Sequence, residues 1–287
     1  MIITALLTSL MMLVCGLPAT QRDFHERDEF NQTYQLPAGA RVEISSIRGS
    51  VKITNADTTT AEVQIIRTAR TRADLEYHKI EVVQTGNSLI VRGLQEPRER
   101  DSRNIQVNHQ VILKLPRSID LSVTSVSGSL QAGDVDGQVH VSSISGSGNL
   151  GNVGGKLQVS SVSGNLEVGN VGGEARVNSV SGSVVLGQVN GSLDVSSVSG
   201  SVNAKLVSLS PQGIHINSVS GSIELGFKSD VNADFSAEQV SGQVYLDVPN
   251  VTRDSEAKSS NVRARIGAGG TPITISSVSG NIRLTRS

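Results

Sequence analysis

The chain has 287 residues, a formal net charge of -1, 2% aromatic residues and no tryptophan. A charge so close to zero excludes the broad positive field typical of proteins that bind nucleic acid or anionic membranes. All phenylalanines and tyrosines lie before residue 121 or after residue 206. The centre of the chain is therefore expected to have a narrow core of aliphatic side chains, without room for rings.

The first 20 residues have the composition of an export signal. Ile2 to Leu17 is almost entirely apolar and too short for a confident membrane span, with a small residue, Ala19, at a plausible cleavage point. No lysine or arginine precedes this stretch, so the basic start of a typical signal is missing. An amphipathic or buried N-terminal helix is the alternative, disfavoured because the stretch is apolar all round and is followed at once by the charged run Gln21 to Glu29. We expect an exported protein, located in the periplasm, at the cell surface or outside the cell, with residues 21–29 as a charged linker.

Cys15 is the only cysteine of the chain. It allows a lipoprotein alternative, in which this residue would carry the lipid anchor. The preceding Met12, Leu13 and Val14 lack the small residue that lipoprotein processing favours, so an unlipidated chain is the preferred prediction. After removal of the signal no cysteine remains, and disulfides cannot stabilise the mature protein.

An 18-residue repeat dominates residues 121–206, where Ser-Val-Ser-Gly or a close variant returns at a fixed interval. Such a period predicts stacked structural units. Within one unit, Leu166 and Val168 alternate as in a short strand, glycines permit bends, and a second strand starts at Ala175. Two short strands and two bends per unit predict an all-β fold, a parallel β-solenoid whose coils stack at ~4.8 Å. The right-handed path is the default for parallel connections.

The repeat extends beyond this region. Residues 42–53 match its frame, and residues 57–120 form an insertion with strand candidates, a helical turn at 72–78 and a hairpin turn at Gly86-Asn87. A solenoid end exposes unpaired strand edges, so the insertion is predicted to be an antiparallel cap over the N-terminal end.

The solenoid domain is thus expected over residues 30–287, with its looser coils at 207–287. In one of these coils Ala264 takes the place of the repeat glycine, and the chain is expected to finish on a complete last coil. The predicted structural repeat positions are Gly49, Gly128, Gly146, Gly164, Gly182, Gly200, Gly221, Gly242 and Gly280.

Stacking of the coils is expected to align polar side chains in files. Two files consist of serines, Ser143, Ser161, Ser179 and Ser197 in one and Ser145, Ser163, Ser181 and Ser199 in the other. A third consists of Asp134, Asn152, Asn170 and Gln188. These residue types suit bends because they bond to nearby backbone, so a structural role is preferred over ligand binding.

No catalytic, cofactor or metal site is predicted. Asp134 and Asp136 are close together, but no other coil repeats the pair, which gives a carboxylate dyad only weak support. The histidines, His25, His78, His109, His140 and His215, lack the spacing of metal ligands. No serine lies in a Gly-x-Ser-x-Gly motif, and the glycine-rich turns do not precede a helix as a phosphate-binding loop would.

The repeat after an export signal resembles the bacterial putative adhesin family, exported β-strand-repeat domains of unknown function. The resemblance rests on Val42 to Ile53, on the frames from Gly128 to Gly242, on Ile273 to Leu284, and on the strand and proline at Leu113 to Pro116. It covers about residues 30–287. It implies a cell-envelope or exported location and a role in adhesion or envelope-stress sensing, and it carries no catalytic residues.

The preferred hypothesis is a non-catalytic exported scaffold that binds an envelope protein or a surface polymer. A sensor of envelope stress that acts through residues 57–120 is the first alternative. An enzyme acting on a polysaccharide is the second, with Asp134 and Asp136 as its only carboxylate candidates.

Overall fold

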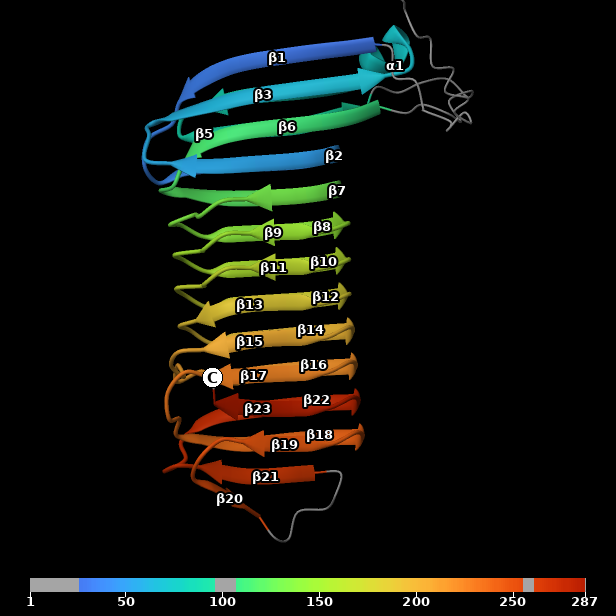
Figure 1. The fold of residues 1–287 in the computed structure, drawn as a ribbon. Coiled ribbons are helices and arrows are strands. Elements are labelled where there is room, and N and C mark those ends of the chain that lie inside the picture. Colours follow the sequence, from blue (N-terminus) through green and yellow to red (C-terminus); the bar gives the residue numbers. More distant parts are fainter. Residues whose placement is uncertain (1–25, 96–106, 255–260, 287) are drawn as a thin grey trace, which may run out of the picture.

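The computed structural model describes residues 26–95, 107–254 and 261–286, so the expected export signal and Cys15 lie outside the described residues. The described chain is a column of stacked strands with one short helix near the N-terminal end (Figure 1). The all-β parallel solenoid predicted from the repeat is confirmed. The right-handed path stays a prediction.

The central coils have the expected 18-residue register. Val159 on one coil pairs in parallel with Val141 on the coil before and with Val177 on the coil after. The long strands stack into one face and the short strands into another, and single bridges between Val135, Val153 and Val171 continue the stack along a turn. The strands of this region are β7 (Ile119–Ala132), β8 (Val139–Ser145), β9 (Gly148–Leu150), β10 (Leu157–Ser163), β11 (Leu166–Val168), β12 (Ala175–Ser181), β13 (Val184–Val189), β14 (Leu193–Ser199) and β15 (Val202–Leu206).

The core of these coils is a file of aliphatic residues. Leu157, Val159, Leu166, Val168 and Val171 of one coil are each at most 2% exposed. Burial of such a side chain contributes about 1.5–3 kcal/mol, and every coil repeats the set. The alternation of apolar and polar residues therefore specifies register, because a slip by one residue would turn each strand's apolar side chains outward.

An antiparallel cap covers the N-terminal end, as predicted (Figure 1). On one side of the cap the strands follow the order β1–β3–β6–β2, with antiparallel pairs β1–β3 and β3–β6, while β4 and β5 form an antiparallel hairpin. The elements of this region are β1 (Glu26–Gln35), β2 (Ala40–Ala56), β3 (Thr60–Ala69), α1 (Arg72–Tyr77), β4 (His78–Thr85), β5 (Ser88–Gln95) and β6 (Val107–Pro116). Because β1 begins at Glu26, the last four residues of the expected linker belong to a strand; their charges suit its exposed edge position.

The cap also contains a parallel coil that the sequence pattern did not reveal. β5 pairs in parallel with the first half of β2, from Arg41 to Ser45, and β6 pairs in parallel with its second half, from Gly49 to Ala56. Together β5 and β6 complete one more coil above β2, although residues 96–106 separate them in sequence. The repeat was hidden because His109 stands opposite Gly49, where the other coils have glycine.

The order of coils at the C-terminal end differs from the order in sequence. β22 pairs in parallel with β16 on one edge and with β18 on the other, and β23 likewise lies between β17 and β19 (Figure 1). The last repeat forms a complete coil, as expected, but it is inserted one coil before the end of the stack. These strands are β16 (Ile214–Ser220), β17 (Ile223–Phe227), β18 (Ala233–Ser241), β19 (Val244–Asp247), β20 (Val251–Arg253), β21 (Asn261–Ile266), β22 (Thr271–Ser279) and β23 (Ile282–Arg286).

The coil predicted around Ala264 is also wrong. This residue lies in β21, which runs antiparallel to both β18 and β20. Its apolar spacing resembles the repeat because any strand with one buried face alternates in the same way. In the structure β20 and β21 form a second antiparallel cap, so both ends of the parallel stack finish in antiparallel strands.

Candidate functional site

The repeat glycines form a column in which each coil touches the next. A Cβ atom added to Gly164 would lie 2.1 Å from the carbonyl oxygen of Gly146, and the backbone φ of Gly164 is +133°. All nine predicted glycines have φ between +124° and +143°. An L side chain is excluded at these positions both by the backbone conformation and by the close approach of the neighbouring coil. The column is a packing feature and offers no polar side chain to a ligand.

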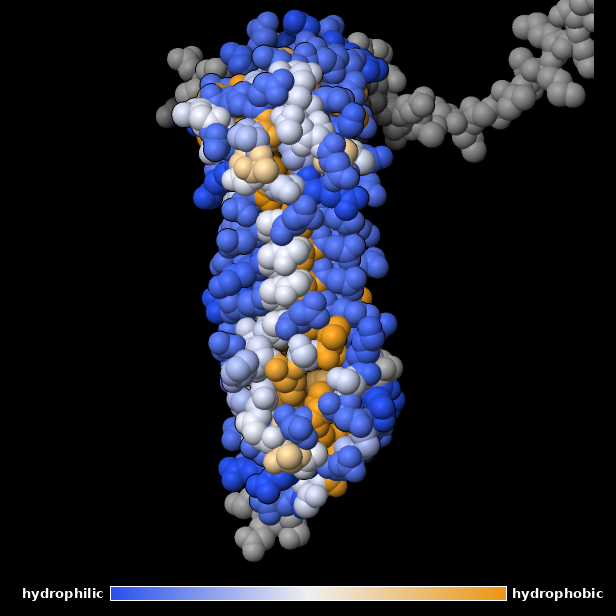
Figure 2. All heavy atoms as spheres, turned by 90° about the vertical axis from the view of Figure 1, so that its left-hand side faces the viewer, coloured by the Kyte–Doolittle hydropathy of each residue, from blue (hydrophilic) through white to orange (hydrophobic). Residues whose placement is uncertain are grey.

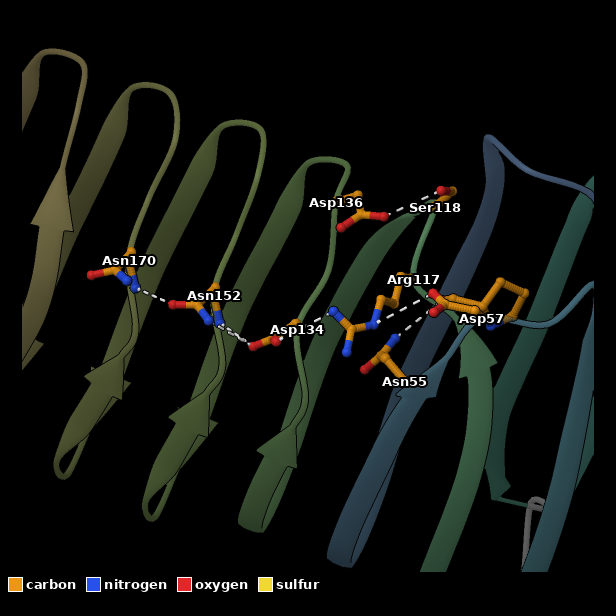
Figure 3. A network of polar contacts seen from close by, with 9 residues as sticks. Asn55, Asp57, Arg117, Ser118, Asp134, Asp136, Asn152 and Asn170 are labelled. Carbon is orange, nitrogen blue, oxygen red and sulfur yellow. Dashed lines mark hydrogen bonds and ion pairs between the residues drawn. The ribbon is translucent and has the colours of Figure 1, made fainter.

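The polar file along one turn forms a hydrogen-bonded ladder (Figure 3). The backbone N–H of Asn152 donates to Oδ1 of Asp134 at 2.8 Å, that of Asn170 to Oδ1 of Asn152 at 2.9 Å, and that of Gln188 to Oδ1 of Asn170 at 2.9 Å. Each side chain thus satisfies the backbone of the next coil. The ladder explains why acceptor side chains occupy this position, and it uses those acceptors internally.

Arg117 terminates the ladder at the cap (Figure 3). Its guanidinium lies 3.6 Å from the carboxylate of Asp134 and 3.7 Å from that of Asp57, while the side-chain amide of Asn55 donates to the carbonyl of Pro116 at 3.1 Å. Asp134, the acceptor at the cap end of the ladder, therefore faces a cation instead of another coil. This junction ties the first regular coil to the end of β2.

The two aspartates considered as a carboxylate dyad have different partners. Asp134 belongs to the ladder and faces Arg117, whereas Asp136 is exposed and accepts from the hydroxyl of Ser118 at 3.2 Å. Among the contacts that the structure describes, no titratable side chain touches both carboxylates. The arrangement lacks the converging polar groups that catalysis requires.

The sequence had led us to expect the serine files at bends, but in the structure they lie in strands. Ser163 and its equivalents Ser145, Ser181 and Ser199 pair in register at the ends of long strands, and their side chains are exposed. Pairing continues up to these serines because the bend is made by the glycine that follows. The positions of Ser143, Ser161, Ser179 and Ser197 also fall inside strands, but their side chains are outside the described part of the structure.

The structure brings together two of the five histidines. His78 and His109 are 5% and 2% exposed, with ring centroids 6.4 Å apart inside the N-terminal cap. His140 and His215 lie on the outward face of the array, and His25 is outside the described residues. Among the described residues no group of three histidine, cysteine, aspartate or glutamate side chains could hold a metal ion.

A shallow hollow of about 340 Å³ lies on the outer face of the long strands. Its walls are outward-facing side chains that recur at 18-residue intervals on successive coils, among them Asp120, Gln138, Lys156 and Glu174 in one file and Ser122, His140, Gln158 and Arg176 in the next. The sequence already contained this pattern, as the 18-residue spacing of the residues that line the hollow. It was missed because each position changes residue type from coil to coil.

Charges of both signs line this outer face. Lys156 lies 3.4 Å from Glu174, and Arg176 lies 2.8 Å from Glu174 and 3.6 Å from Asp194. Exposed ion pairs of this kind contribute at most about 1 kcal/mol each. A partner with complementary charges could replace them at little cost, which makes the outer face a candidate binding surface.

The edge that carries the glycine-rich turns has a different character. Figure 2 shows a pale stripe along this edge and a gathering of hydrophobic side chains over the coils near the C-terminal end. Partly buried apolar residues of those coils include Leu209, Val231, Val248 and Val251.

No helix among residues 26–95, 107–254 and 261–286 is long and apolar enough to cross a membrane.

Comparison with known proteins identifies a family. The model of the Toastrack DUF4097 family matches residues 40–285. No match was found among curated proteins. Solved structures with similarity include a putative adhesin from Parabacteroides distasonis, with 12% identity, coverage of 90% of this chain and 97% of that chain, and a TM-score of 0.47. A putative adhesin from Bacteroides fragilis has 11% identity, the same coverage and a TM-score of 0.44.

A third solved structure, described as a putative lipid binding protein from Parabacteroides distasonis, has 12% identity, coverage of 90% of this chain and 97% of that chain, and a TM-score of 0.27. The family match spans nearly the whole described column, from the start of β2 to within β23, and confirms the resemblance found in the repeat. The chain belongs to the Toastrack DUF4097 family.

Proposed function

We propose that this protein is a non-catalytic, exported scaffold of the cell envelope that binds an envelope protein or a surface polymer through the outer face of its long strands. The observation that carries the proposal is the hollow on this face, whose charged lining residues are Arg41 on β2, Asp120 on β7, Arg176 on β12, and Lys156 and Glu174 directly before β10 and β12. These charges are exposed and paired only weakly, whereas the polar file on the turn edge is consumed by the ladder. The outer face is thus a polar surface that is available to a partner.

A binding role also agrees with the chemistry of the other groups. The aspartates considered as a dyad are held by Arg117 and Ser118, and the repeat glycines serve contact between coils. The regular coils are too tight to form loops around a cleft. These features support a scaffold over an enzyme acting on a polysaccharide.

The binding test uses charge reversal on the outer face. The double variant Lys156→Glu, Arg176→Glu changes two residues of the hollow, and Lys205→Glu is the matched control, because Lys205 is exposed on β15 and does not line the hollow. Affinity capture from envelope fractions, followed by titration of the identified partner, should show at least tenfold weaker binding for the double variant only. Equal binding by all three proteins would remove the outer face as the binding surface.

The location test is independent of the partner. Fractionation combined with mass spectrometry of the mature N-terminus should find the chain outside the cytoplasm and starting near residue 20. A lipid-modified Cys15 at the N-terminus would support the lipoprotein alternative. An intact chain in the cytoplasm would contradict export and with it the envelope role.

Envelope-stress sensing is a second candidate, favoured by one observation. The cap formed from residues 57–120 contains the buried pair His78 and His109, whose burial lowers both pKa values. Because the folded cap disfavours the protonated rings, acidification below the ordinary histidine pKa would destabilise the cap. The test is a reporter of envelope stress in cells with His109→Leu: a sensor role predicts an altered response at acidic pH, and an unchanged response contradicts it.

A further inference from the structure

A second hollow lies in the N-terminal cap, on a different part of the molecule from the outer face. It has a volume of about 440 Å³ and is lined by Ser46, Ile47, Arg48, His78, Gly93, Leu94, His109 and Ser127. A water molecule takes up about 30 Å³ in the liquid, so the space is much larger than one water needs. It lies at the end of the glycine column, where His109 stands opposite Gly49.

His109 is the unusual group of this hollow. The residue is 2% exposed, and neither of its ring nitrogens has a hydrogen-bond partner in the described structure. The carbonyl oxygen of His78 lies close enough to the His109 ring to raise its pKa slightly. That oxygen accepts a hydrogen bond from Arg67 at 3.0 Å and does not reach the His109 ring with hydrogen-bond geometry. A buried polar group without a partner is destabilising, and such groups in native proteins call for an explanation.

The charges around the hollow decide between a cation and an anion. Arg48 lines it, and Arg67 lies close enough to affect His109. Of the two nearby carboxylates, Asp28 is paired to Arg67 and Asp74 acts on His78, whereas every charged group that acts on His109 is a cation. A metal ion would meet this positive field with only two imidazoles as ligands. An anion would be attracted by Arg48 and would find hydrogen-bond donors on both rings and on the hydroxyls of Ser46 and Ser127.

The backbone of the hollow is held in an uncommon conformation. Ser46 has φ of +57°, one of two described non-glycine residues with a positive φ. Its carbonyl would lie 2.1 Å from a Cβ atom on Gly93, so the wall of the hollow depends on glycine at that position. Strained residues of this kind are enriched at binding sites.

We propose that the hollow bounded by His78, His109 and Arg48 binds a small oxyanion group, either phosphate or carboxylate. One ring N–H of His109 donates to the anion, the N–H of His78 and the guanidinium of Arg48 complete the contacts, and the hydroxyls of Ser46 and Ser127 add further donors. This site is independent of the partner surface on the long strands. Each can fail without the other.

Binding at this site is coupled to protonation. The charged and titratable groups that face the two rings are Arg48 on β2, Arg67 on β3, which is paired with Asp28 on β1, and Asp74 on α1, with the ring of Tyr77 4.8 Å from His78. An anion among these groups stabilises the protonated rings. The proton uptake of His78 and His109 therefore rises when the anion binds, and affinity increases as pH falls toward 6.

The experiment follows the imidazole ¹⁵N resonances of the full chain during titration with inorganic phosphate at constant ionic strength and pH 6.5. The expected result is saturable shifts of His78 and His109, with the resonances of His140 and His215 unchanged. Arg48→Gln should weaken binding at least tenfold. Lys52→Gln is the matched control, since Lys52 is an exposed cation on the same strand that does not line the hollow, and it should bind as the unmodified chain does.

Two further arms identify the form of the anion. Titration with methyl phosphate tests a phosphate carried by a larger molecule, and titration with acetate tests a carboxylate; saturation by any of the three probes at His109 supports the site. His109→Leu should abolish the response, and because Arg48 is exposed, Arg48→Gln keeps the test valid if His109→Leu fails to fold. Absence of saturation with all three probes, or equal binding by Arg48→Gln and Lys52→Gln, would overturn the proposal and leave a hollow filled by water.

Discussion

Gly280 lies directly on Gly221, although strands β18 to β21 lie between the two coils in sequence. A Cβ atom added to Gly280 would meet the carbonyl oxygen of Gly221 at 1.9 Å. In turn, a Cβ atom added to Gly242 would meet the carbonyl oxygen of Gly280 at 1.9 Å. The glycine column therefore follows the spatial order of the coils, with the last coil of the chain between two earlier ones.

The first prediction concerns this column. Gly280→Ala should lower the free energy of unfolding by about 2–4 kcal/mol, since the methyl group would meet backbone on the next coil and φ is +131°. Gly39→Ala is the control, because its φ is +76° but no atom lies within 4 Å of the added Cβ; it should cost about 1 kcal/mol. Urea unfolding measures both, and equal losses would show that contact between coils is not the cause.

The second prediction concerns the inserted coil. A chain that ends at residue 270 lacks β22 and β23, so β18 loses its parallel partner and β19 loses the only strand with which it pairs in the described structure. Amide hydrogen exchange should then show loss of protection throughout residues 233–247, while β10 to β13 keep theirs. Retained protection in β18 and β19 would contradict the insertion of the last coil between two earlier ones.

The third prediction concerns pH. Burial, reinforced by His78, Arg67 and Arg48, lowers the pKa of His109 to about 4 from an ordinary value of 6.5. Between these values the unfolded chain binds a proton that the folded chain does not, so stability falls as pH decreases from 6.5 to 4, by up to about 3 kcal/mol. Urea unfolding across this range, in buffers without phosphate or carboxylate, measures the loss.

His109→Leu should flatten this pH dependence, because the group that takes up the proton is removed. His215→Leu is the control, since His215 is exposed on the array and its ring lies 3.0 Å from the carbonyl of Gln212. A pH dependence that survives in His109→Leu would assign the loss of stability to other groups.

The fourth prediction concerns the ladder. Asn152→Ala removes the acceptor of the Asn170 N–H and the side-chain donor to Asp134, and should cost about 1 kcal/mol. Asn152→Asp keeps the acceptor and should cost less at neutral pH, although it places a second carboxylate beside Asp134. Asn190→Ala, an exposed asparagine outside the ladder, should change stability by under about 0.5 kcal/mol. Thermal unfolding of the three variants tests this order.

Local patterns were sufficient for the regular coils. Leu166 and Val168 alternate with polar residues, and Gly164, the repeat glycine two residues before Leu166, makes the bend with a positive φ. Because each coil contacts only its neighbours, the register of 18 residues could be derived from the period itself. The polar file ending at Gln188 was expected for the same reason, and the structure adds which backbone N–H each acceptor satisfies.

The sequence by itself determined the repeat unit, its core residues and the need for a cap, because these depend on contacts one period apart. Only the tertiary structure decided which coils are neighbours at the two ends. β5 and β6 form one coil across residues 96–106, and β22 enters between β16 and β18; strands with the same apolar alternation can pair in several orders, so only long-range packing selects one. The proximity of the His78 and His109 rings follows from this long-range packing, since the two residues approach each other only when β6 lies on β2 and α1 closes over β3.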